Sequence, residues 1–426
     1  MMSSTADSLH KIDLFIVGGG MIGSALAARL AASGMQIALL ENNPPALFDA
    51  ASTPDLRVSA LSPASINFLE QAQVWPTIQA MRTAPFKRMQ VWENRRDQGT
   101  LFDATEVDAP WLGHIVENRL VQLACLETLQ DYDNITLLCP DEITQITYQP
   151  EGSRIHLKSG QAFEAKLLIG ADGANSQVRK AAGIASDSQQ YPMHALVATV
   201  SIQGGERDIT WQRFTPDGPQ SLLPLPGDYA SLVWYHRPSE VRRLLTLEDD
   251  ALLDAFRQHF PAALPDITGL VQRGSFPLAR SHAQAYARQG VALIGDAAHT
   301  IHPLAGQGVN LGFQDAAVLS RILLQTWQEG GDIAALSRLQ GYERERKLAN
   351  LVMQRAMDAF SYGFSNDITP LRALRNLGLK LADHHGPVKR EVIRYALGLG
   401  QPSLPLPAPL RNLAARLEVF SSKQPS

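Results

Sequence analysis

The sequence predicts an α/β fold (α+β overall), in which a Rossmann-like nucleotide-binding domain is interrupted by an antiparallel-sheet domain and followed by a helical C-terminal region. Three observations support this prediction. An apolar run, a glycine-rich turn and a helical pattern follow one another near the N-terminus. Two more apolar runs, each ending in a turn with an aspartate, lie near residues 172 and 296. Between these two lie short runs of alternating residues, which are typical of antiparallel strands.

The N-terminal segment has the order of a dinucleotide-binding unit. Residues 12–17 are mostly apolar, as in a strand buried on both faces of a parallel sheet, and residues 18–23 (GGGMIG) fit the pattern G-x-G-x-x-G. In this pattern Gly18 permits the tight turn, Gly20 lets the backbone approach a pyrophosphate, and Gly23 allows close packing of helix and strand. The start of the helix supplies free N–H groups and a partial positive charge for phosphates.

The unit continues into a second strand, predicted at 37–40, which ends at Glu41. A carboxylate at this place accepts hydrogen bonds from both hydroxyls of an adenosine ribose. It would also repel a 2′-phosphate. The segment therefore favours an unphosphorylated adenosine ribose and disfavours NADP as the nucleotide bound at this position.

Two later segments supply further parts of a nucleotide domain. Residues 167–170 predict a strand, Asp172 follows in a sharp turn, and Asn175 or Ser176 can cap the next helix. A third strand of the same sheet is predicted at 290–295. A simple nicotinamide enzyme needs only the first unit, so three separated segments indicate a longer ligand.

The turn and loop after the third strand indicate the chemistry most sharply. Asp296 lies in an acidic turn that can hold the hydroxyls of a polyol. The glycine-rich loop at 306–310 leads into a helix and can press its backbone N–H groups against a flat, electron-rich ring. Together they predict the ribityl and isoalloxazine half of an FAD site, so we expect an FAD-binding domain of the glutathione-reductase type. His299 in the same turn is expected to be structural.

The segments between the second and third units predict an inserted substrate domain. Strands are expected at 195–202, 209–214 and 230–235 within an antiparallel sheet from about 190 to 280, to which residues 70–115 add a further part. Aromatic residues of this sheet are candidates for an apolar substrate pocket, with core packing as the alternative for each: Trp211, Phe214, Trp234, Tyr235 and Phe276.

The predicted domains follow from these segments. They are a discontinuous FAD-binding domain at 10–70, 115–185 and 288–330, a substrate domain at 71–114 and 186–287, a helical region at 331–400, and a Pro-rich linker and tail at 401–426.

Composition limits the class of protein. The chain has 426 residues, of which 45% are hydrophobic, and a net charge of −4, so it is long enough for two domains and has no sign of general nucleic-acid binding. Two cysteines, Cys125 and Cys139, are too few for a disulfide framework and lack metal-ligand spacing. We therefore expect a reduced, cytoplasmic setting and no metal.

The C-terminal region is expected to be mainly helical from Val309 to about Gly400. A leucine stripe with basic neighbours lies within it (Leu371, Leu374, Leu377 and Leu381 beside Arg372, Arg375 and Lys380). One interpretation is a helix packed on the body of the protein. The other is a basic amphipathic face for peripheral contact with the inner face of a membrane or with a partner protein.

The three motifs, in this order and spacing, resemble those of the FAD-dependent aromatic hydroxylases of the para-hydroxybenzoate hydroxylase type. The resemblance covers roughly residues 10–400 and is closest to the ubiquinone-biosynthesis branch. The segments that carry it are Asp55–Ser62 (DLRVSALS), Val116–Arg119 (VENR) and Gly306–Gly312 (GQGVNLG). Residues 210–219, 231–235, 364–366 and 375–379 resemble the member of that branch which acts on demethoxyubiquinol.

The resemblance implies a set of cofactor contacts. Pro303 would border the reacting face of the flavin, and no catalytic base is assigned. The implied cofactor-binding residues are Gly18, Gly20, Met21, Ile22, Gly23, Glu41, Arg57, Asn118, Arg119, Asp172, Asp296, Gly306, Gln307, Gly308, Val309 and Asn310.

The resemblance also implies the reaction. FAD would be bound, with NAD(P)H and O2 as co-substrates, and oxygen would reach the ring of a polyprenylated benzoquinol through a flavin C4a-hydroperoxide. Other ubiquinone-biosynthesis proteins would be partners in a complex. Three alternatives stay open: a hydroxylase of another ring position or of a small soluble phenol, a flavoprotein reductase or dehydrogenase, and a non-enzymatic flavin-binding subunit.

Overall fold

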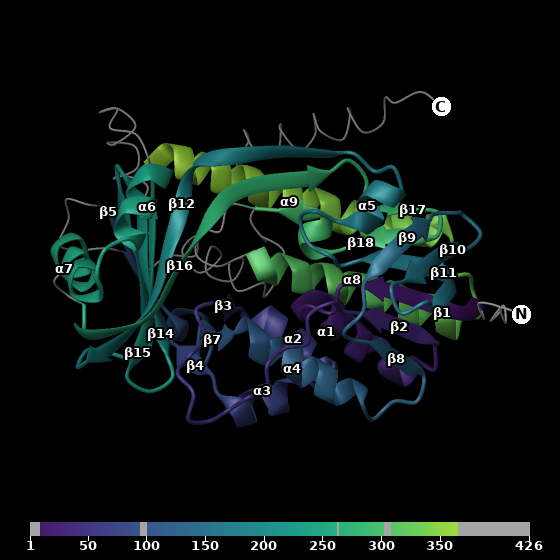
Figure 1. Cartoon of the computed structure of the whole chain (residues 1–426), viewed down its shortest axis with the longest axis horizontal. Coiled ribbons are helices and arrows are strands. Elements are labelled where there is room, and N and C mark those ends of the chain that lie inside the picture. Colours follow the sequence, from purple (N-terminus) through teal and green to yellow (C-terminus); the bar gives the residue numbers. More distant parts are fainter. Residues whose placement is uncertain (1–8, 94–99, 262–263, 302–307, 365–426) are drawn as a thin grey trace, which may run out of the picture.

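The computed structural model describes residues 9–93, 100–261, 264–301 and 308–364. In these residues the strands form two eight-stranded sheets and one three-stranded sheet. One large sheet lies at the right of Figure 1 and the other at the left, and β12 and β16 run from one side to the other along the top. The helices α8 and α9 lie between them and on the right-hand sheet (Figure 1).

The first sheet, at the right, holds the predicted nucleotide unit. Its main order is β17-β18-β11-β1-β2-β8, with β1 parallel to both β11 and β2, and β18 parallel to β11. β10 and β9 extend it from β11. The strands are β1 (Leu9–Val17), β2 (Ile37–Leu40), β8 (Ile135–Leu138), β9 (Ile143–Thr147), β10 (Ser153–Leu157), β11 (Ala162–Gly170), β17 (Ala287–Arg288) and β18 (Val291–Leu293).

The apolar runs explain why this sheet lies in a buried core. Leu14, Phe15 and Ile16 are fully buried, as expected for a parallel strand covered on both faces. They share a core with α1 (Met21–Leu30) and α4 (Asn118–Leu129). The helix α8 (Gly308–Gln328) packs against α1, and α9 (Leu336–Phe364) packs against α8.

The second sheet is mostly antiparallel and has the order β19-β16-β12-β15-β14-β13-β5-β6. Only β5 pairs in parallel, with β13. The strands are β5 (Arg88–Glu93), β6 (Thr100–Asp103), β12 (Ser186–Gln203), β13 (Ile209–Thr215), β14 (Gly218–Leu225), β15 (Tyr229–His236), β16 (Asp266–Ala283) and β19 (His299–Thr300).

The two faces of the second sheet have different neighbours. Leu196, Ala198 and Trp234 lie in one core cluster with residues of α6 (Pro238–Leu245) and α7 (Asp249–His259). The alternate residues Val197 and Tyr235 lie in another cluster, with Leu56 from the loop before β3. We call the first the helix-covered face and the second the inner face. The inner face therefore looks toward the first sheet.

A three-stranded sheet joins the two halves. It consists of β3 (Val58–Leu61), β7 (Gly113–Glu117) and β4 (Ala84–Phe86), and its residues pack with Leu223 and Leu225 of β14. The remaining described elements are short: α2 (Pro63–Gln71), α3 (Trp75–Met81), α5 (Gln177–Ala181), η1 (Ala31–Ser33), η2 (Ala104–Val107) and η3 (Gly295–Ala297).

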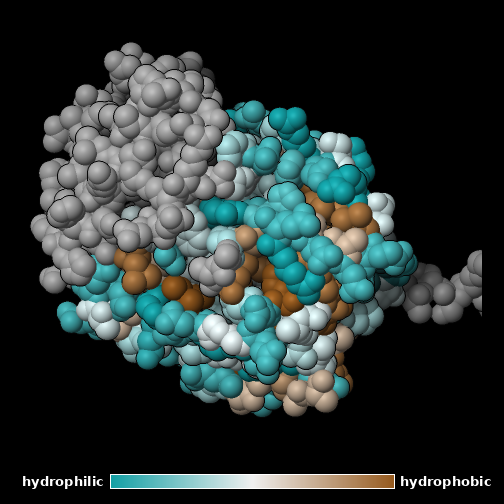
Figure 2. All heavy atoms as spheres, turned by 90° about the vertical axis from the view of Figure 1, so that its left-hand side faces the viewer, coloured by the Kyte–Doolittle hydropathy of each residue, from teal (hydrophilic) through white to brown (hydrophobic). Residues whose placement is uncertain are grey.

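The surface of the left-hand half is mixed in character. Figure 2 shows hydrophobic residues in a band across the middle of this face, between more hydrophilic regions. Among the described residues, no helix combines the length and apolar character needed to span a membrane. The predicted leucine stripe and the linker and tail at 401–426 lie outside these residues.

The predicted fold class is confirmed, and several strands fall close to their predicted places. The strand predicted at 37–40 is β2, and that predicted at 209–214 is contained in β13. Residues 70–115 were expected to add to the second sheet, but they contribute to two sheets. β5 and β6 extend the second sheet, whereas β4 belongs to the three-stranded sheet. The predicted domain limits stay a prediction.

Candidate functional site

The glycine turn after β1 has the geometry that the motif predicts. Gly18 has a φ of +102°, and a Cβ there would lie 2.4 Å from the carbonyl oxygen of Ala171. A Cβ at Gly23 would lie 1.9 Å from the carbonyl oxygen of Gly18. A Cβ at Gly20 would instead have no neighbour within 4 Å. Gly18 and Gly23 are thus needed for close packing, whereas Gly20 borders open space at the start of α1.

That open space belongs to a cavity of about 400 Å³. Its wall combines the start of α1, the loop before β3, the first turns of α4 and one residue of β16. No side chain caps α1, so the N–H groups of its first turn are available to an anion. The lining residues are Gly20, Met21, Asp55, Leu56, Arg57, Asn118, Arg119, Gln122 and Gln272.

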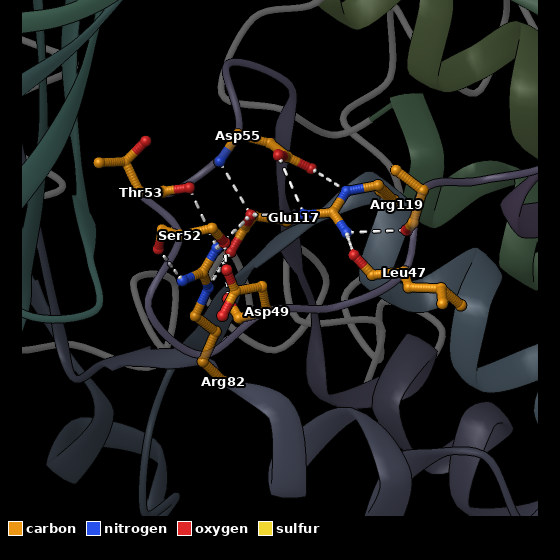
Figure 3. A network of polar contacts seen from close by, with 9 residues as sticks. Leu47, Asp49, Ser52, Thr53, Asp55, Arg82, Glu117 and Arg119 are labelled. Carbon is orange, nitrogen blue, oxygen red and sulfur yellow. Dashed lines mark hydrogen bonds and ion pairs between the residues drawn. The ribbon is translucent and has the colours of Figure 1, made fainter.

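A network of ion pairs fixes the loop that borders this cavity (Figure 3). Glu117, which is 2% exposed, accepts from Nε of Arg82 at 2.6 Å and from the N–H of Asp55 at 2.8 Å. Arg119 donates to both carboxylate oxygens of Asp55, at 2.8 and 3.1 Å, and to the carbonyl oxygen of Leu47 at 3.0 Å. Most donors of Arg119 are therefore committed to the loop.

Three other predicted cofactor residues lie around the same space. Glu41 follows β2 and is half-buried, and its Oε1 accepts from the N–H of Asn43 at 2.9 Å. Asn118 lines the cavity, and its Oδ1 accepts from the hydroxyl of Ser59 at 2.7 Å. Arg57 is exposed, and its guanidinium lies 5.4 Å from the ring centroid of Phe276.

Asp172 caps the helix after β11. Its Oδ2 accepts from the N–H groups of Gln177 and Val178 at 2.6 and 3.3 Å. Its Oδ1 is buried without a hydrogen-bond partner in the described chain. Of the two predicted capping residues, Ser176 is the N-cap, since its hydroxyl accepts from the N–H of Arg179. One carboxylate oxygen of Asp172 therefore caps the helix, and the other has no hydrogen-bond partner in the described chain.

Asp296 lies in η3 with an exposed side chain, between the buried residues Gly295 and Ala297. Its carboxylate makes no hydrogen bond within the part of the chain that the structure describes. The surrounding protein raises the pKa of this carboxyl by desolvation, while the charges of His299 and Arg57 lower it. A carboxylate without a protein partner is free to accept hydrogen bonds from hydroxyls of a ligand.

A buried cluster holds this turn in place. Asp315 is fully buried and accepts from the N–H of Gly295 at 3.1 Å, Nε2 of His299 at 2.5 Å, Nε of Arg346 at 2.8 Å and Nδ2 of Asn350 at 3.0 Å. Burial alone would raise the pKa of Asp315, but the charges of its partners lower it to about 2. The cluster connects α8 and α9 to η3, and His299 has a structural position in it.

The start of α8 agrees with the helix expected after the glycine loop. Gly308 is its first residue, and Gly308 and Val309 are half-buried. Asn310 is 2% exposed, and its Oδ1 accepts from the N–H of Ser62 at 2.9 Å while its Nδ2 donates to Ala60 at 2.8 Å. Its side chain therefore ties α8 to β3. Pro303, Gly306 and Gln307 lie outside the described residues.

The predicted substrate-pocket aromatics divide between the two faces of the second sheet. Trp211 and Trp234 lie on the helix-covered face, where their ring centroids are 5.8 and 5.6 Å from that of Phe260. Phe276 packs with the inner-face cluster, and Phe214 alternates with Trp211 and lies on the inner side. These aromatic residues therefore lie on opposite faces of the sheet, because neighbouring side chains of a strand alternate between its two faces.

Some lining residues carried little or no sequence signal. Gln122 lies four residues after Asn118, on the same side of α4, and donates to the carbonyl oxygen of Gly19 at 2.9 Å. That helical spacing could have identified it. Leu56 and Gln272 come from a loop and from a strand of the second sheet, and only the folded chain brings them to the cavity.

The chain matches the model of the FAD binding domain family over residues 11–358 and belongs to that family.

Several relatives are similar over nearly the whole chain. The chain is 44% identical to the 3-demethoxyubiquinol 3-hydroxylase of Escherichia coli, over 91% of this chain and 98% of that protein. It is 35% identical to the ubiquinone hydroxylase UbiL of Rhodospirillum rubrum, over 91% and 89%, and 34% identical to the human ubiquinone biosynthesis monooxygenase COQ6, over 90% and 92%.

Solved structures have the same fold at low sequence identity. The p-nitrophenol 4-monooxygenase PnpA of Pseudomonas putida superposes with a TM-score of 0.74 at 19% identity, covering 98% of this chain and all of that one. PqsL of Pseudomonas aeruginosa in complex with 2-aminobenzoylacetate gives 0.73 at 22% identity, covering 84% and 97%.

Proposed function

We propose that this protein is an FAD-dependent monooxygenase that hydroxylates the ring of demethoxyubiquinol, a polyprenylated benzoquinol, in ubiquinone biosynthesis. The observation that carries the proposal is the near full-length similarity to a 3-demethoxyubiquinol 3-hydroxylase at 44% identity. The cavity beside Gly20 supports it, because it borders the uncapped start of α1, where the motif requires a pyrophosphate.

The described residues fit FAD. The pyrophosphate would lie on the uncapped start of α1, against Gly20, Met21 and Ile22, and the adenosine ribose would bind Glu41 at the end of β2. Asp296 would accept hydrogen bonds from the ribityl hydroxyls. Asp172, whose backbone nitrogen lies beside Gly18, would be near the pyrophosphate.

The start of α8 would complete the site at the ring. The positive end of its dipole, at Gly308, favours negative charge at the pyrimidine end of a reduced flavin, and Arg57 adds a positive charge near the cleft. When bound, the flavin supplies electron transfer from NAD(P)H and the activation of O2. The protein binds and orients both ligands and keeps water from the reacting centre.

The inner face of the second sheet is the proposed wall of the substrate site. It joins apolar side chains, including Val197, Leu278 and Phe276, to the loop that carries Arg57. An apolar wall next to the cofactor cavity suits a flat, alkylated ring.

Delivery of such a substrate implies partners. A polyprenyl tail is insoluble, so we propose that the quinol reaches the protein from a membrane surface or from other ubiquinone-biosynthesis proteins in a complex. The basic leucine-rich segment with Leu371, Leu374 and Arg375 is the proposed contact, on the grounds of its sequence pattern. Protease protection of this segment by anionic vesicles or by the complex would test the contact.

The function is tested in a strain that lacks the gene. Mass spectrometry of its quinones should show accumulated demethoxyubiquinone, which the wild-type gene removes. A stably folded Asp296→Ala protein should fail to do so and should contain little FAD. Asp133→Ala is the matched control, because Asp133 is an exposed aspartate in the loop before β8.

The alternatives predict other results. A different accumulated intermediate would move the protein to another ring position, and an unchanged quinone pool would favour a soluble phenol as substrate. A reductase would need no O2. A non-enzymatic subunit would bind FAD fully and oxidise NAD(P)H without forming product.

A further inference from the structure

The glycine turn after β1 is held by a side chain that is distant in sequence. Gln122 of α4 donates from Nε2 to the carbonyl oxygen of Gly19 at 2.9 Å, across 103 residues. In the part of the chain that the structure describes, no other hydrogen bond to Gly19 is found. Gln122 also lines the cavity beside Gly20, so this contact lies at the wall of the cavity.

The turn needs such a contact because three successive glycines form it, and glycines have no Cβ to restrict their backbone dihedral angles. Backbone groups fix its two ends. The N–H of Gly18 donates to the carbonyl oxygen of Leu40 at 3.0 Å. The carbonyl oxygen of Gly20 accepts from the N–H and the hydroxyl of Ser24, at 3.0 and 2.8 Å. Neither bond fixes Gly19, which lies between these ends.

Gly19 lies between two side chains of the site. On one side it touches Glu41, since a Cβ on Gly19 would lie 2.7 Å from the Cβ of Glu41. The carbonyl group of Gly19 is bound by Gln122. A peptide between two glycines can rotate with little steric resistance. The bond to Gln122 is therefore the contact that fixes the direction of this carbonyl group.

A second amide of α4 has a similar place. Asn118 lines the same cavity, and its Oδ1 accepts from the hydroxyl of Ser59 in β3 at 2.7 Å. Residues four apart lie on the same side of a helix. The amides of Asn118 and Gln122 thus tie β3 and the glycine turn to one side of α4, and α4 sets the distance between them.

We propose that Gln122 is a positioning residue for the cofactor. By holding Gly19, it keeps the glycine turn in the one conformation in which the start of α1 faces the pyrophosphate of FAD. The role rests on the binding of FAD, which the proposed function requires. It predicts that Gln122 affects ligands that carry the pyrophosphate and leaves the binding of the adenosine part unchanged.

The test titrates the full-length protein with FAD by fluorescence, with ADP or adenosine as the competitor. Gln122→Met has a similar length but no donor. It should weaken the binding of FAD and of ADP by about tenfold, as expected for the loss of one hydrogen bond. Adenosine should compete within twofold of its wild-type strength. Gln122→Asn keeps an amide but is one carbon too short to reach Gly19, so it should show the same losses.

Gln130→Met is the matched control. Gln130 is exposed and directly follows the last residue of α4, so its replacement should leave all three affinities unchanged. FAD and ADP affinities of Gln122→Met within twofold of wild type would overturn the proposal. Equal losses for ADP and adenosine would also overturn it, because Gln122 would then stabilise the whole domain and not the pyrophosphate site. Wild-type affinities in Gln122→Asn would overturn it as well.

The failure of this proposal and of the proposed function can be told apart. Wild type that binds FAD, loses ADP affinity on Gln122→Met and hydroxylates no quinol would overturn the function alone. Wild type that hydroxylates demethoxyubiquinol, with Gln122→Met equal to it in FAD and ADP affinity, would overturn the role of Gln122 alone.

Discussion

Replacement of Asp315 by Asn tests whether the buried cluster holds the Asp296 turn. Asp315 accepts from four donors, one of which is the charged guanidinium of Arg346, itself 6% exposed. An amide at this place has the same shape, but it carries no charge and turns N–H groups toward other donors. The variant therefore leaves a buried cation without its partner.

The magnitude follows from that loss. Breaking a buried ion pair by removing one partner costs about 3–5 kcal/mol, so Asp315→Asn should lose that much unfolding free energy. Arg321→Met is the control, because it breaks an exposed ion pair of the same helix, that of Arg321 with Glu345 at 2.6 Å. Such a pair contributes less than about 1 kcal/mol. Urea unfolding measures both.

The same residue gives a dependence on pH. Its folded pKa of about 2 lies below the ordinary value of 3.8, so the ionised carboxylate stabilises the fold above about pH 4. That stability is lost as the pH falls from about 4 to 2, and Asp315→Asn should lack this part of the acid transition. FAD affinity should also fall, since the turn is released. A loss below about 1 kcal/mol with unchanged FAD affinity would refute the reasoning.

Three further predictions concern the site and the fold. Gly20→Ala should fold normally but bind FAD at least tenfold more weakly, whereas Gly23→Ala should fail to fold, because only the second Cβ meets the backbone; FAD content and solubility check this. Arg82→Ala should weaken FAD binding by loosening the loop paired to Glu117 at 2.6 Å, measured by fluorescence titration, and unchanged affinity would contradict it. Burial lowers the pKa of His114 to about 4 from 6.5, so stability should fall by up to about 3 kcal/mol between pH 6.5 and 4, and His114→Phe should remove that slope.

The nucleotide half of the fold could be predicted closely because its signals are local. The strand β2 is a short apolar run between turns. The motif at 18–23 needs glycine at positions 18 and 23, because a Cβ there would meet the carbonyl oxygens of nearby residues. In the second sheet, β12 extends over 18 residues, beyond the strand predicted at 195–202, and the 18 residues of β16 were expected only as part of the sheet from about 190 to 280. Their bulges interrupt the alternation on which a strand prediction depends.

The parts of the site that escaped prediction depend on contacts between distant segments. Trp211 and Trp234 have the composition of a pocket, but only the position of α6 and α7 shows that they pack in the core under these helices. Gln272 reaches the cavity because β16 crosses the molecule beside the loop at Arg57.

The central claim is that this protein transfers an oxygen atom from O2 to a quinol ring. The most direct measurement is turnover of demethoxyubiquinol by the FAD-loaded protein with NAD(P)H under isotopically labelled O2, with the product analysed by mass spectrometry. We predict one labelled oxygen in the new ring hydroxyl, together with product formation that depends on the quinol. Oxidation of NAD(P)H without labelled product, when FAD is fully bound, would contradict the account.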